Sequence, residues 1–195
     1  MILGSARRGN IWYATVTSRE ERLVACSFSD NKKAAEQSAI RSLPNGLRRD
    51  LVRSPSESKV IGMLHRIYTG KGINPRPSVA LMTPSEFLRS VYKATMKIPK
   101  GKVITYGDLA KLVNSRRAAR AVGNAMARNP LPLVIPCHRV VPSTLQVGNY
   151  GSERNGRSRT KRALLVNEGV QFAGEKISQK CVCFCNYLGS CFVQS

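Results

Sequence analysis

The chain has 195 residues, and its 32 Lys and Arg side chains against 11 Asp and Glu give a formal net charge of +21 at pH 7. This length allows one large domain or two small ones, and a hydrophobic content of 42% indicates that most of the chain folds. Apolar runs stay below the roughly 18–20 residues that span a bilayer, and the first residues form too short an apolar stretch for a secretory signal. We therefore expect no membrane partner and a location in the cytoplasm or nucleus.

The strong positive charge predicts a polyanionic partner, because basic side chains that neutralise phosphates release counterions. The basic excess is densest between residues 76 and 168. A generally basic protein without such a partner is the alternative.

Six cysteines are unevenly placed along the chain. Cys26 and Cys137 stand alone, whereas four others crowd the segment 179–195 at positions 181, 183, 185 and 191. The small number of cysteines before this segment fits a reducing compartment better than a disulfide scaffold. The C-x-C-x-C-x5-C spacing differs from usual zinc patterns, so we expect a flexible Cys-rich tail, with a metal site or a disulfide as alternatives.

The first 75 residues predict a small α/β domain. Two β-rich runs, 11–16 and 23–28, are followed by helical patterns over 32–43 and 58–69. Asn74-Pro75-Arg76-Pro77 is typical of a stiff extended segment, so residues 76–82 are predicted to be a linker.

Residues 83–178 predict a mostly helical second domain, which makes the whole chain α+β. Thr83 is expected to cap a helix that runs to about Lys97, with Pro84 at its first position and Glu86 completing a capping box. Thr105 is expected to cap a short helix over 106–113, and Asp108 is expected to complete its capping box. A polar turn and a helix over 116–129 follow, which together have the outline of a helix-turn-helix.

The helix over 116–129 combines arginines with small residues. A smooth surface of Ala and Gly allows a helix to press closely against a shallow groove, where Arg120 could enter a duplex as a wedge. An alanine-rich core helix with solvated arginines is the alternative reading.

The segment 133–142 is an apolar run interrupted by Cys137, His138 and Arg139. A buried His or Arg is costly without partners, so this triplet indicates a chemical role. A thiol near positive charge ionises more readily, and the thiolate is the nucleophile. In extended backbone, neighbouring side chains point to opposite sides, so the sequence predicts a water-mediated proton relay between Cys137 and His138 unless the backbone turns.

These segments together resemble the O6-alkylguanine-DNA alkyltransferases, also called methylated-DNA–protein-cysteine methyltransferases. The family signature Pro-Cys-His-Arg-Val is present at residues 136–140. The accompanying segments are 103–106, 109–110, 118–123, 129–130, 147–150, 164–165 and 168–169. The resemblance is strong over about residues 83–172 and loose over the first 75.

The resemblance implies an RNase H-like first domain and a winged helix-turn-helix in the second. It further implies a single-turnover DNA-repair methyltransferase that moves an alkyl group from guanine O6 onto Cys137 irreversibly, without a cofactor or metal. The partner is double-stranded DNA carrying O6-alkylguanine, whose damaged base is flipped out through the minor groove. The protein is expected to be a monomer.

The resemblance also assigns roles to individual residues. The catalytic residues it implies are Cys137, His138, Glu168, Asn129 and Tyr106. The residues implied to bind the substrate base are Met126, Val140, Tyr150 and Gly151, and those implied to contact DNA are Arg120, Ala118, Ala119, Ala121, Gly123 and Thr105. Lys161 corresponds to a basic residue near the pocket, while Arg139 is as well explained by structural ion pairing as by catalysis.

Two other functions are compatible with parts of the sequence. A non-catalytic sensor of alkylated DNA would use the same helices but replaces the cysteine, which is present here. A thiol hydrolase could use Cys137, His138 and Glu168, but it leaves the Arg120 helix unexplained.

Overall fold

The computed structural model describes residues 1–54, 59–72, 76–83, 85–151, 158–185 and 191–193. The chain divides into two compact units, Met1–Pro84 with Asn129–Val134, and Ser85–Arg128 with Ile135–Ser195. The mixture of helices and strands confirms that the chain combines both, as the predicted α+β class requires. No helix among the described residues is long and apolar enough to cross a membrane.

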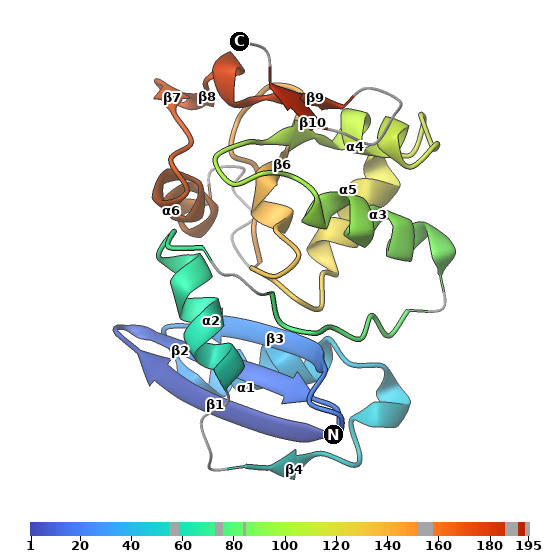
Figure 1. Cartoon of the computed structure of the whole chain (residues 1–195), viewed down its shortest axis with the longest axis vertical. Coiled ribbons are helices and arrows are strands. Elements are labelled where there is room, and N and C mark those ends of the chain that lie inside the picture. Colours follow the sequence, from blue (N-terminus) through green and yellow to red (C-terminus); the bar gives the residue numbers. More distant parts are fainter. Residues whose placement is uncertain (55–58, 73–75, 84, 152–157, 186–190, 194–195) are drawn as a thin grey trace. The chain divides into compact units, whose positions relative to one another are not determined.

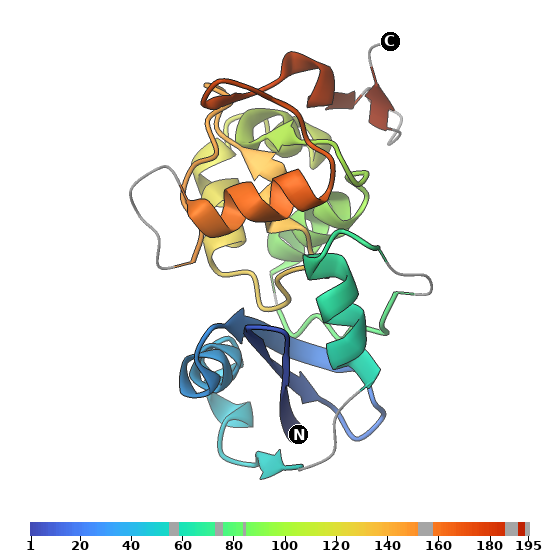
Figure 2. The ribbon, with the colours of Figure 1, turned by 90° about the vertical axis from the view of Figure 1, so that its left-hand side faces the viewer.

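The first unit is a four-stranded sheet with a helix on each face (Figures 1 and 2). Its elements are β1 Ile2–Arg8, β2 Ile11–Thr17, β3 Leu23–Ser29, α1 Lys32–Arg41, η1 Asn45–Leu47, β4 Val52–Arg53 and α2 Lys59–Tyr68. The strand order is β3-β2-β1-β4, with β1 antiparallel to β2 and parallel to β4. The predictions of β2, β3, α1 and α2 are confirmed, whereas β1 was not predicted.

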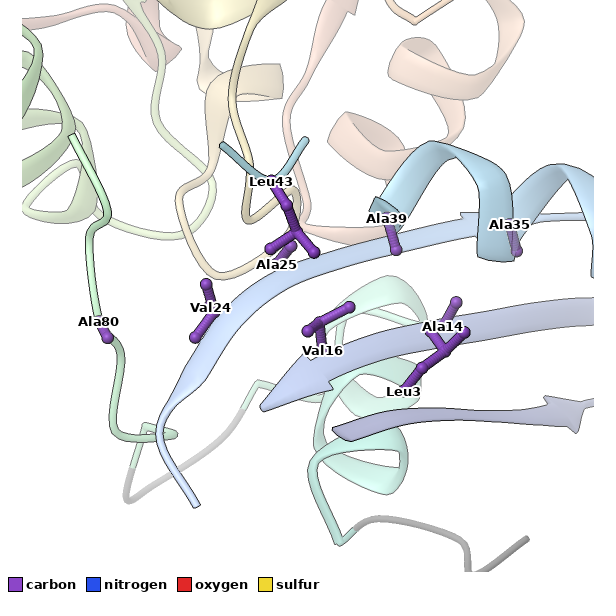
Figure 3. Packing of buried hydrophobic residues seen from close by; sticks show 9 residues of the cluster. All are labelled: Leu3, Ala14, Val16, Val24, Ala25, Ala35, Ala39, Leu43 and Ala80. Carbon is purple, nitrogen blue, oxygen red and sulfur yellow. The ribbon is translucent and has the colours of Figure 1, made fainter. Parts of the chain in front are cut away.

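The central strand β2 explains why both faces are covered. Tyr13, Ala14, Thr15 and Val16 are all buried, so side chains on both sides of the pleat leave water. Tyr13 contacts His65 of α2, through its hydroxyl 3.2 Å from Nδ1. The opposite face packs against α1 in a cluster of small apolar side chains (Figure 3): Leu3, Ala14, Val16, Val24, Ala25, Ala35, Ala39, Leu43 and Ala80.

The predicted linker 76–82 is partly built into the first unit. The backbone of Leu23 accepts from Ala80 and donates to Ser78, and Ala80 belongs to the apolar cluster. This segment therefore extends the edge of the sheet instead of forming a free connection. The N-terminal stretch of the first unit runs to Pro84, two residues beyond the expected linker, and Asn129–Val134 adds to the same unit.

The second unit contains three neighbouring helices, α3 Glu86–Met96, α4 Tyr106–Leu112 and α5 Ala119–Ala127, together with α6 Arg159–Asn167 (Figure 1). Its short strands are β5 Ile104–Thr105, β6 Val140–Val141, β7 Phe172–Ala173, β8 Lys176–Ile177, β9 Cys183–Cys185 and β10 Cys191–Val193. The 3-10 turns are η2 Cys137–Arg139 and η3 Gln179–Cys181. The parallel pairing of β5 with β6 brings the start of α4 beside the segment that follows Cys137.

Three predicted helix starts can be compared with the structure. Thr105 caps α4 as expected, because its hydroxyl accepts from the Asp108 N–H. The cap of α3 is Ser85, whose hydroxyl accepts from the Leu88 N–H, so the prediction of Thr83 was wrong; Pro84 lies outside the described residues. The helix predicted from Arg116 begins three residues later, because residues 116–118 form a turn that enters α5 without a side-chain cap.

Candidate active site

A tight turn carries Cys137, and this corrects the expected extended run. Leu133 has φ +75°, and Pro136 precedes the 3-10 turn Cys137–Arg139. The Cys137 N–H donates to the Ile135 carbonyl at 2.7 Å, and the Val140 N–H donates to the Cys137 carbonyl. Successive side chains in a 3-10 turn lie about 120° apart instead of on opposite sides. The thiol is buried, with 7% of the residue exposed.

His138 and Glu168 meet in the interior of the second unit. Nε2 of His138 lies 2.9 Å from Oε1 of Glu168, and only 1% and 3% of the two side chains are exposed. Glu168 is the C-terminal capping residue of α6, so the helix end fixes its backbone. Because the ionised carboxylate can only accept, Nε2 carries the proton of a neutral imidazole, which makes Nδ1 the acceptor nitrogen. Nδ1 has no hydrogen-bond partner among the described residues.

Arg139 holds the same carboxylate from its other side. Its Nε donates to Oε2 of Glu168 at 2.7 Å, and Nη2 donates to Oε1 at 2.7 Å. A third donor, Nη1, reaches the carbonyl of Ile98 at 2.6 Å, just beyond the end of α3. Such paired hydrogen bonds from a guanidinium fix both the position and the orientation of a carboxylate. Arg139 thus joins the turn that carries Cys137 to two other elements.

This arrangement sets the ionisation of the pair. Burial alone would raise the pKa of Glu168, but hydrogen bonds from His138 and Arg139, together with the positive charge of Arg139, lower it to about 2. Burial lowers the pKa of His138 below its usual range, and the partial compensation by Glu168 does not reverse that shift. At neutral pH the site therefore contains an ionised carboxylate and a neutral imidazole, which can accept a proton.

Lys161 of α6 is buried next to the same turn. Only 1% of the residue is exposed, and Nζ donates to the Val140 carbonyl at 2.7 Å. The ammonium lies 6.0 Å from the centre of the Tyr106 ring. Burial lowers the pKa of Lys161 to about 8, although the negative charge of a Cys137 thiolate acts in the opposite direction.

Tyr106 begins α4, directly after its cap Thr105. Burial and the negative charge of Cys137 raise the pKa of its hydroxyl above the usual value. The hydroxyl therefore stays protonated at neutral pH and can act as a donor close to the thiol.

The other residues expected at the substrate base occupy different environments. Met126 of α5 is buried, with its sulfur 3.9 Å from the Thr95 hydroxyl, and Val140 is fully buried. Tyr150 is half-buried, and Gly151 is exposed with φ +54°. The longer basic loop expected after Gly151 falls at 152–157, outside the described residues.

Asn129 belongs to the segment that follows α5. Its side-chain oxygen accepts from the Leu131 N–H at 2.9 Å, within the part of the chain grouped with the first unit. This hydrogen bond orders the chain after the helix end.

The residues expected to contact DNA lie on α5 or directly before it, except for Thr105, which is half-buried at the cap of α4. Arg120 and Ala121 are exposed, whereas Ala118, Ala119 and Gly123 are half-exposed. The exposed face continues along the helix with the following residues: Arg117, Asn124, Ala127 and Arg128. The opposite face packs inward through Val122, Ala125 and Met126. The outward face is therefore low in relief and carries only positive charge among its ionisable groups.

The expected flexible tail begins with ordered structure. The backbone of Val103 exchanges hydrogen bonds with Cys181 and Cys183, and both cysteines are buried. Cys181 also belongs to a second apolar cluster: Val103, Val141, Leu165, Val170, Ile177, Cys181 and Val182. Within the described residues, no group of three or more potential metal ligands is found.

Arg139 and Lys161 contribute more to the structure of the site than the sequence indicated. Arg139 organises Glu168, and Lys161 is buried against the turn, although lysine is almost never fully buried. For Arg139, the signal was its place inside an apolar run. For Lys161, the helical spacing from Leu164 and Leu165 placed it on the buried face of α6.

Comparison with known proteins gives a consistent result. Residues 86–170 match the family model of the 6-O-methylguanine DNA methyltransferase DNA-binding domain. The chain is 41% identical over 120 residues to a methylated-DNA–protein-cysteine methyltransferase of Archaeoglobus fulgidus, which covers 60% of this chain and 78% of that protein. A protein of the same name from Thermococcus sibiricus is 48% identical over 86 residues, covering 44% of this chain and 45% of the relative.

Solved structures show the same fold. The O6-methylguanine-DNA methyltransferase of Pyrococcus kodakaraensis matches with a TM-score of 0.63 and 28% identity, covering 87% of this chain and 99% of that one. The Mycobacterium tuberculosis OGT, solved in complex with DNA, matches with a TM-score of 0.66 and 22% identity, covering 87% and 94%.

Proposed function

The chain belongs to the family of methylated-DNA–protein-cysteine methyltransferases, which are DNA-repair alkyltransferases, and we propose that Cys137 is its alkyl acceptor. The observation that carries this proposal is the buried set of Cys137, His138, Glu168 and Arg139 on one turn and one helix end. An ionised carboxylate that orients a neutral imidazole beside a thiol is the arrangement that activates a sulfur nucleophile.

In the proposed reaction, the thiol proton passes to Nδ1 of His138, either directly or through one water molecule. The thiolate attacks the alkyl carbon on guanine O6, so that an S–C bond forms while the C–O6 bond breaks. The Tyr106 hydroxyl, which burial keeps protonated, donates a hydrogen bond to the leaving guanine, and the proton taken up by His138 balances the negative charge released onto the base. A thioether is a poor leaving group, so the protein is consumed in a single turnover.

The same proposal assigns the remaining substrate contacts. The backbone N–H of Gly151 is directed to O6, and the carbonyls of Cys137 and Val140 accept from the exocyclic amine of the base. Met126 and Tyr150 form the walls of the base pocket, and Asn129 ties the end of α5 to the segment before the active turn.

We also propose that α4 and α5 act as a winged helix-turn-helix, with α5 in the minor groove of double-stranded DNA. The exposed face of α5 supports this, because Ala121 and Gly123 allow a close approach and Arg120 extends from the same surface. Arg120 would fill the gap left by the flipped base. Thr105, Ala118 and Ala119 lie at the edges of this contact.

The glycine at position 123 supports such a contact independently. A Cβ added there meets no atom within 4 Å, so packing within the protein does not require glycine. Glycine in a helix costs roughly 0.5–1 kcal/mol relative to alanine. A close approach by another molecule accounts for this cost.

The finer architecture and setting are also proposals. The sheet order β3-β2-β1-β4 with helices on both faces supports an RNase H-like first unit. We place the protein in the cytoplasm or nucleus with the DNA, acting as a monomer without a cofactor or metal.

A duplex that carries O6-[methyl-³H]methylguanine tests the assignment of the acceptor. We expect one label per protein molecule, located on Cys137 by mass spectrometry. Cys137→Ser should abolish transfer while it still binds the duplex, and Cys26→Ser, which removes a buried cysteine of the first unit, should transfer normally. Label released as a small molecule would support a hydrolase, and binding without transfer would support a sensor.

The same assay tests base flipping. Arg120→Ala should slow duplex repair by about tenfold or more, equivalent to about 1.4 kcal/mol. Its reaction with free O6-benzylguanine should not change, because no base has to be extruded. Lys176→Ala removes an exposed charge elsewhere in the second unit and should change neither rate. Equal slowing of both reactions by Arg120→Ala would remove the flipping role.

A further inference from the structure

The inference concerns the buried charges around Cys137. Among the described residues, the buried ionisable side chains of the second unit include Arg139, Glu168, His138 and Lys161. Glu168 is committed to Arg139 and His138 by three hydrogen bonds. In the described part of the chain, Lys161 has no carboxylate within ion-pair distance, and its ammonium donates to the Val140 carbonyl. A buried ammonium without a counterion is strongly unfavourable.

The negative charge that acts on this ammonium is that of the Cys137 thiolate, which favours the protonated lysine. Lys161 binds Val140, which directly follows the turn Cys137–Arg139 and caps it by donating to the Cys137 carbonyl. The other titratable groups around the ammonium are Tyr106, whose ring is 6.0 Å away, and His138. Tyr106 stays protonated, and His138 is neutral before it takes up the thiol proton and cationic afterwards, so neither supplies a negative charge at neutral pH.

The site also holds the ammonium in place sterically. Gly148 has φ +78°, and a Cβ there would lie 3.2 Å from a Pro142 carbon and 3.9 Å from Nζ of Lys161. The lysine stem is therefore enclosed between α6 and the segment 140–148. Withdrawal of Nζ to solvent requires this packing to open.

We propose that Lys161 is the counter-cation of the Cys137 thiolate and that alkylation turns it into a destabilising charge. The inference rests on the proposed function, because transfer converts the anionic sulfur into a neutral thioether. The ammonium then remains buried against the Val140 carbonyl without its anion. The second unit then either opens around α6 or loses the proton of Lys161. The alkylated protein is therefore less stable than the unmodified protein because of this unbalanced charge.

The direction of the pH dependence follows from linkage. A lysine whose folded pKa is lowered to about 8 binds fewer protons in the folded than in the unfolded state between about pH 8 and its ordinary value of 10.5. The cost of burying the ammonium is thus full below about pH 8 and disappears as the pH rises toward 10.5. Loss of the thiolate lowers this pKa further and enlarges the cost at neutral pH.

Thermal melting of the unmodified and S-benzylated proteins tests the proposal. Free O6-benzylguanine supplies the alkyl group, and mass spectrometry verifies the modification. We expect alkylation to lower Tm by several degrees at pH 7 and by less than half as much at pH 9.5. In Lys161→Met, which keeps the length of the side chain without its charge, the loss should be small and equal at both pH values. An equal loss in wild type and Lys161→Met would overturn the proposal.

Further variants separate this inference from the proposed function. Cys137→Ser removes the thiolate without any transfer, so it should show the same pH-dependent loss of Tm even if O6-benzylguanine does not react. Lys111→Met, an exposed lysine of the same unit, should leave the effect of alkylation unchanged. Glu153→Gln tests the carboxylate at 153, outside the described residues; if it reproduced the pH dependence, Cys137 would not be the counterion.

Discussion

The first unit fills its interior with small apolar side chains between a sheet and α1, whereas the second unit buries a carboxylate, a guanidinium, an ammonium and an imidazole. The apolar interior is stabilised by removal of surface from water, at about 25 cal/mol per Å². The charged interior depends on complete pairing, since each ion loses its hydration. The difference indicates that the second unit accepts the larger cost in folding to position chemical groups. Among the described residues of the first unit, the buried charge is the carboxylate of Glu36, which is paired with Ser5 and the exposed Arg53.

Of the substitutions that test this comparison, Arg139→Met should cause the largest decrease in the free energy of unfolding. Removal of the guanidinium leaves Glu168 buried with only His138 as a partner, and such a loss typically costs about 3–5 kcal/mol. Chemical denaturation of the variant should show this decrease in the free energy of unfolding. The matched control is Lys111→Met, because the exposed Lys111 forms with the half-buried Asp108 a surface ion pair that is worth at most about 1 kcal/mol. Similar losses in both variants would erase the distinction between the buried and exposed charges.

A cavity in the first unit should produce a smaller loss. Leu43 is 2% exposed within the apolar cluster, and Leu43→Ala should lower stability by about 3 kcal/mol through lost burial and an unfilled cavity. At a temperature where the variant is folded, its reaction with free O6-benzylguanine should keep the wild-type rate. A large fall in that rate would show that the chemistry of the second unit depends on the packing of the first.

The smallest change in stability is expected when one helical glycine in each unit is replaced by alanine. Added Cβ atoms at Gly62 of α2 and Gly123 of α5 both meet no atom within 4 Å. Both alanine variants should be more stable by roughly 0.5–1 kcal/mol, because alanine favours helix. Only Gly123→Ala should weaken binding to duplex DNA, as measured by fluorescence anisotropy at fixed salt. Unchanged binding by Gly123→Ala would remove α5 from the DNA contact.

Local signals predicted much of the fold. Thr105 and Asp108 identify the start of α4, because a capping hydrogen bond involves residues only three apart. The β-rich runs over 11–16 and 23–28 likewise predicted the strands β2 and β3. β1 was not predicted, since Gly4, Ser5 and Ala6 have little strand propensity and are held by pairing with β2.

Features that depend on distant residues were harder to predict. The turn at Cys137 reads as an apolar strand in sequence, yet Pro136 and the positive φ of Leu133 redirect the backbone. The spacing of Lys161 from Leu164 and Leu165 indicates the buried face of α6, but its acceptor, the Val140 carbonyl, lies 21 residues earlier, so no local pattern specifies that hydrogen bond. The motif did identify Cys137, His138 and Glu168 as candidates, but their assembly is a property of the folded unit.

The hydrogen bonds from His138 and Arg139 to Glu168 join residues 30 and 29 positions apart. The residues of α6 must therefore be synthesised before Glu168 can orient the imidazole of His138 beside the Cys137 sulfur. A nascent chain that ends before Glu168 carries an ordinary thiol. This order of events protects a protein that reacts only once, because the thiol of an incomplete chain is not activated and does not react irreversibly with other electrophiles. Reactivity in this molecule is a late product of synthesis.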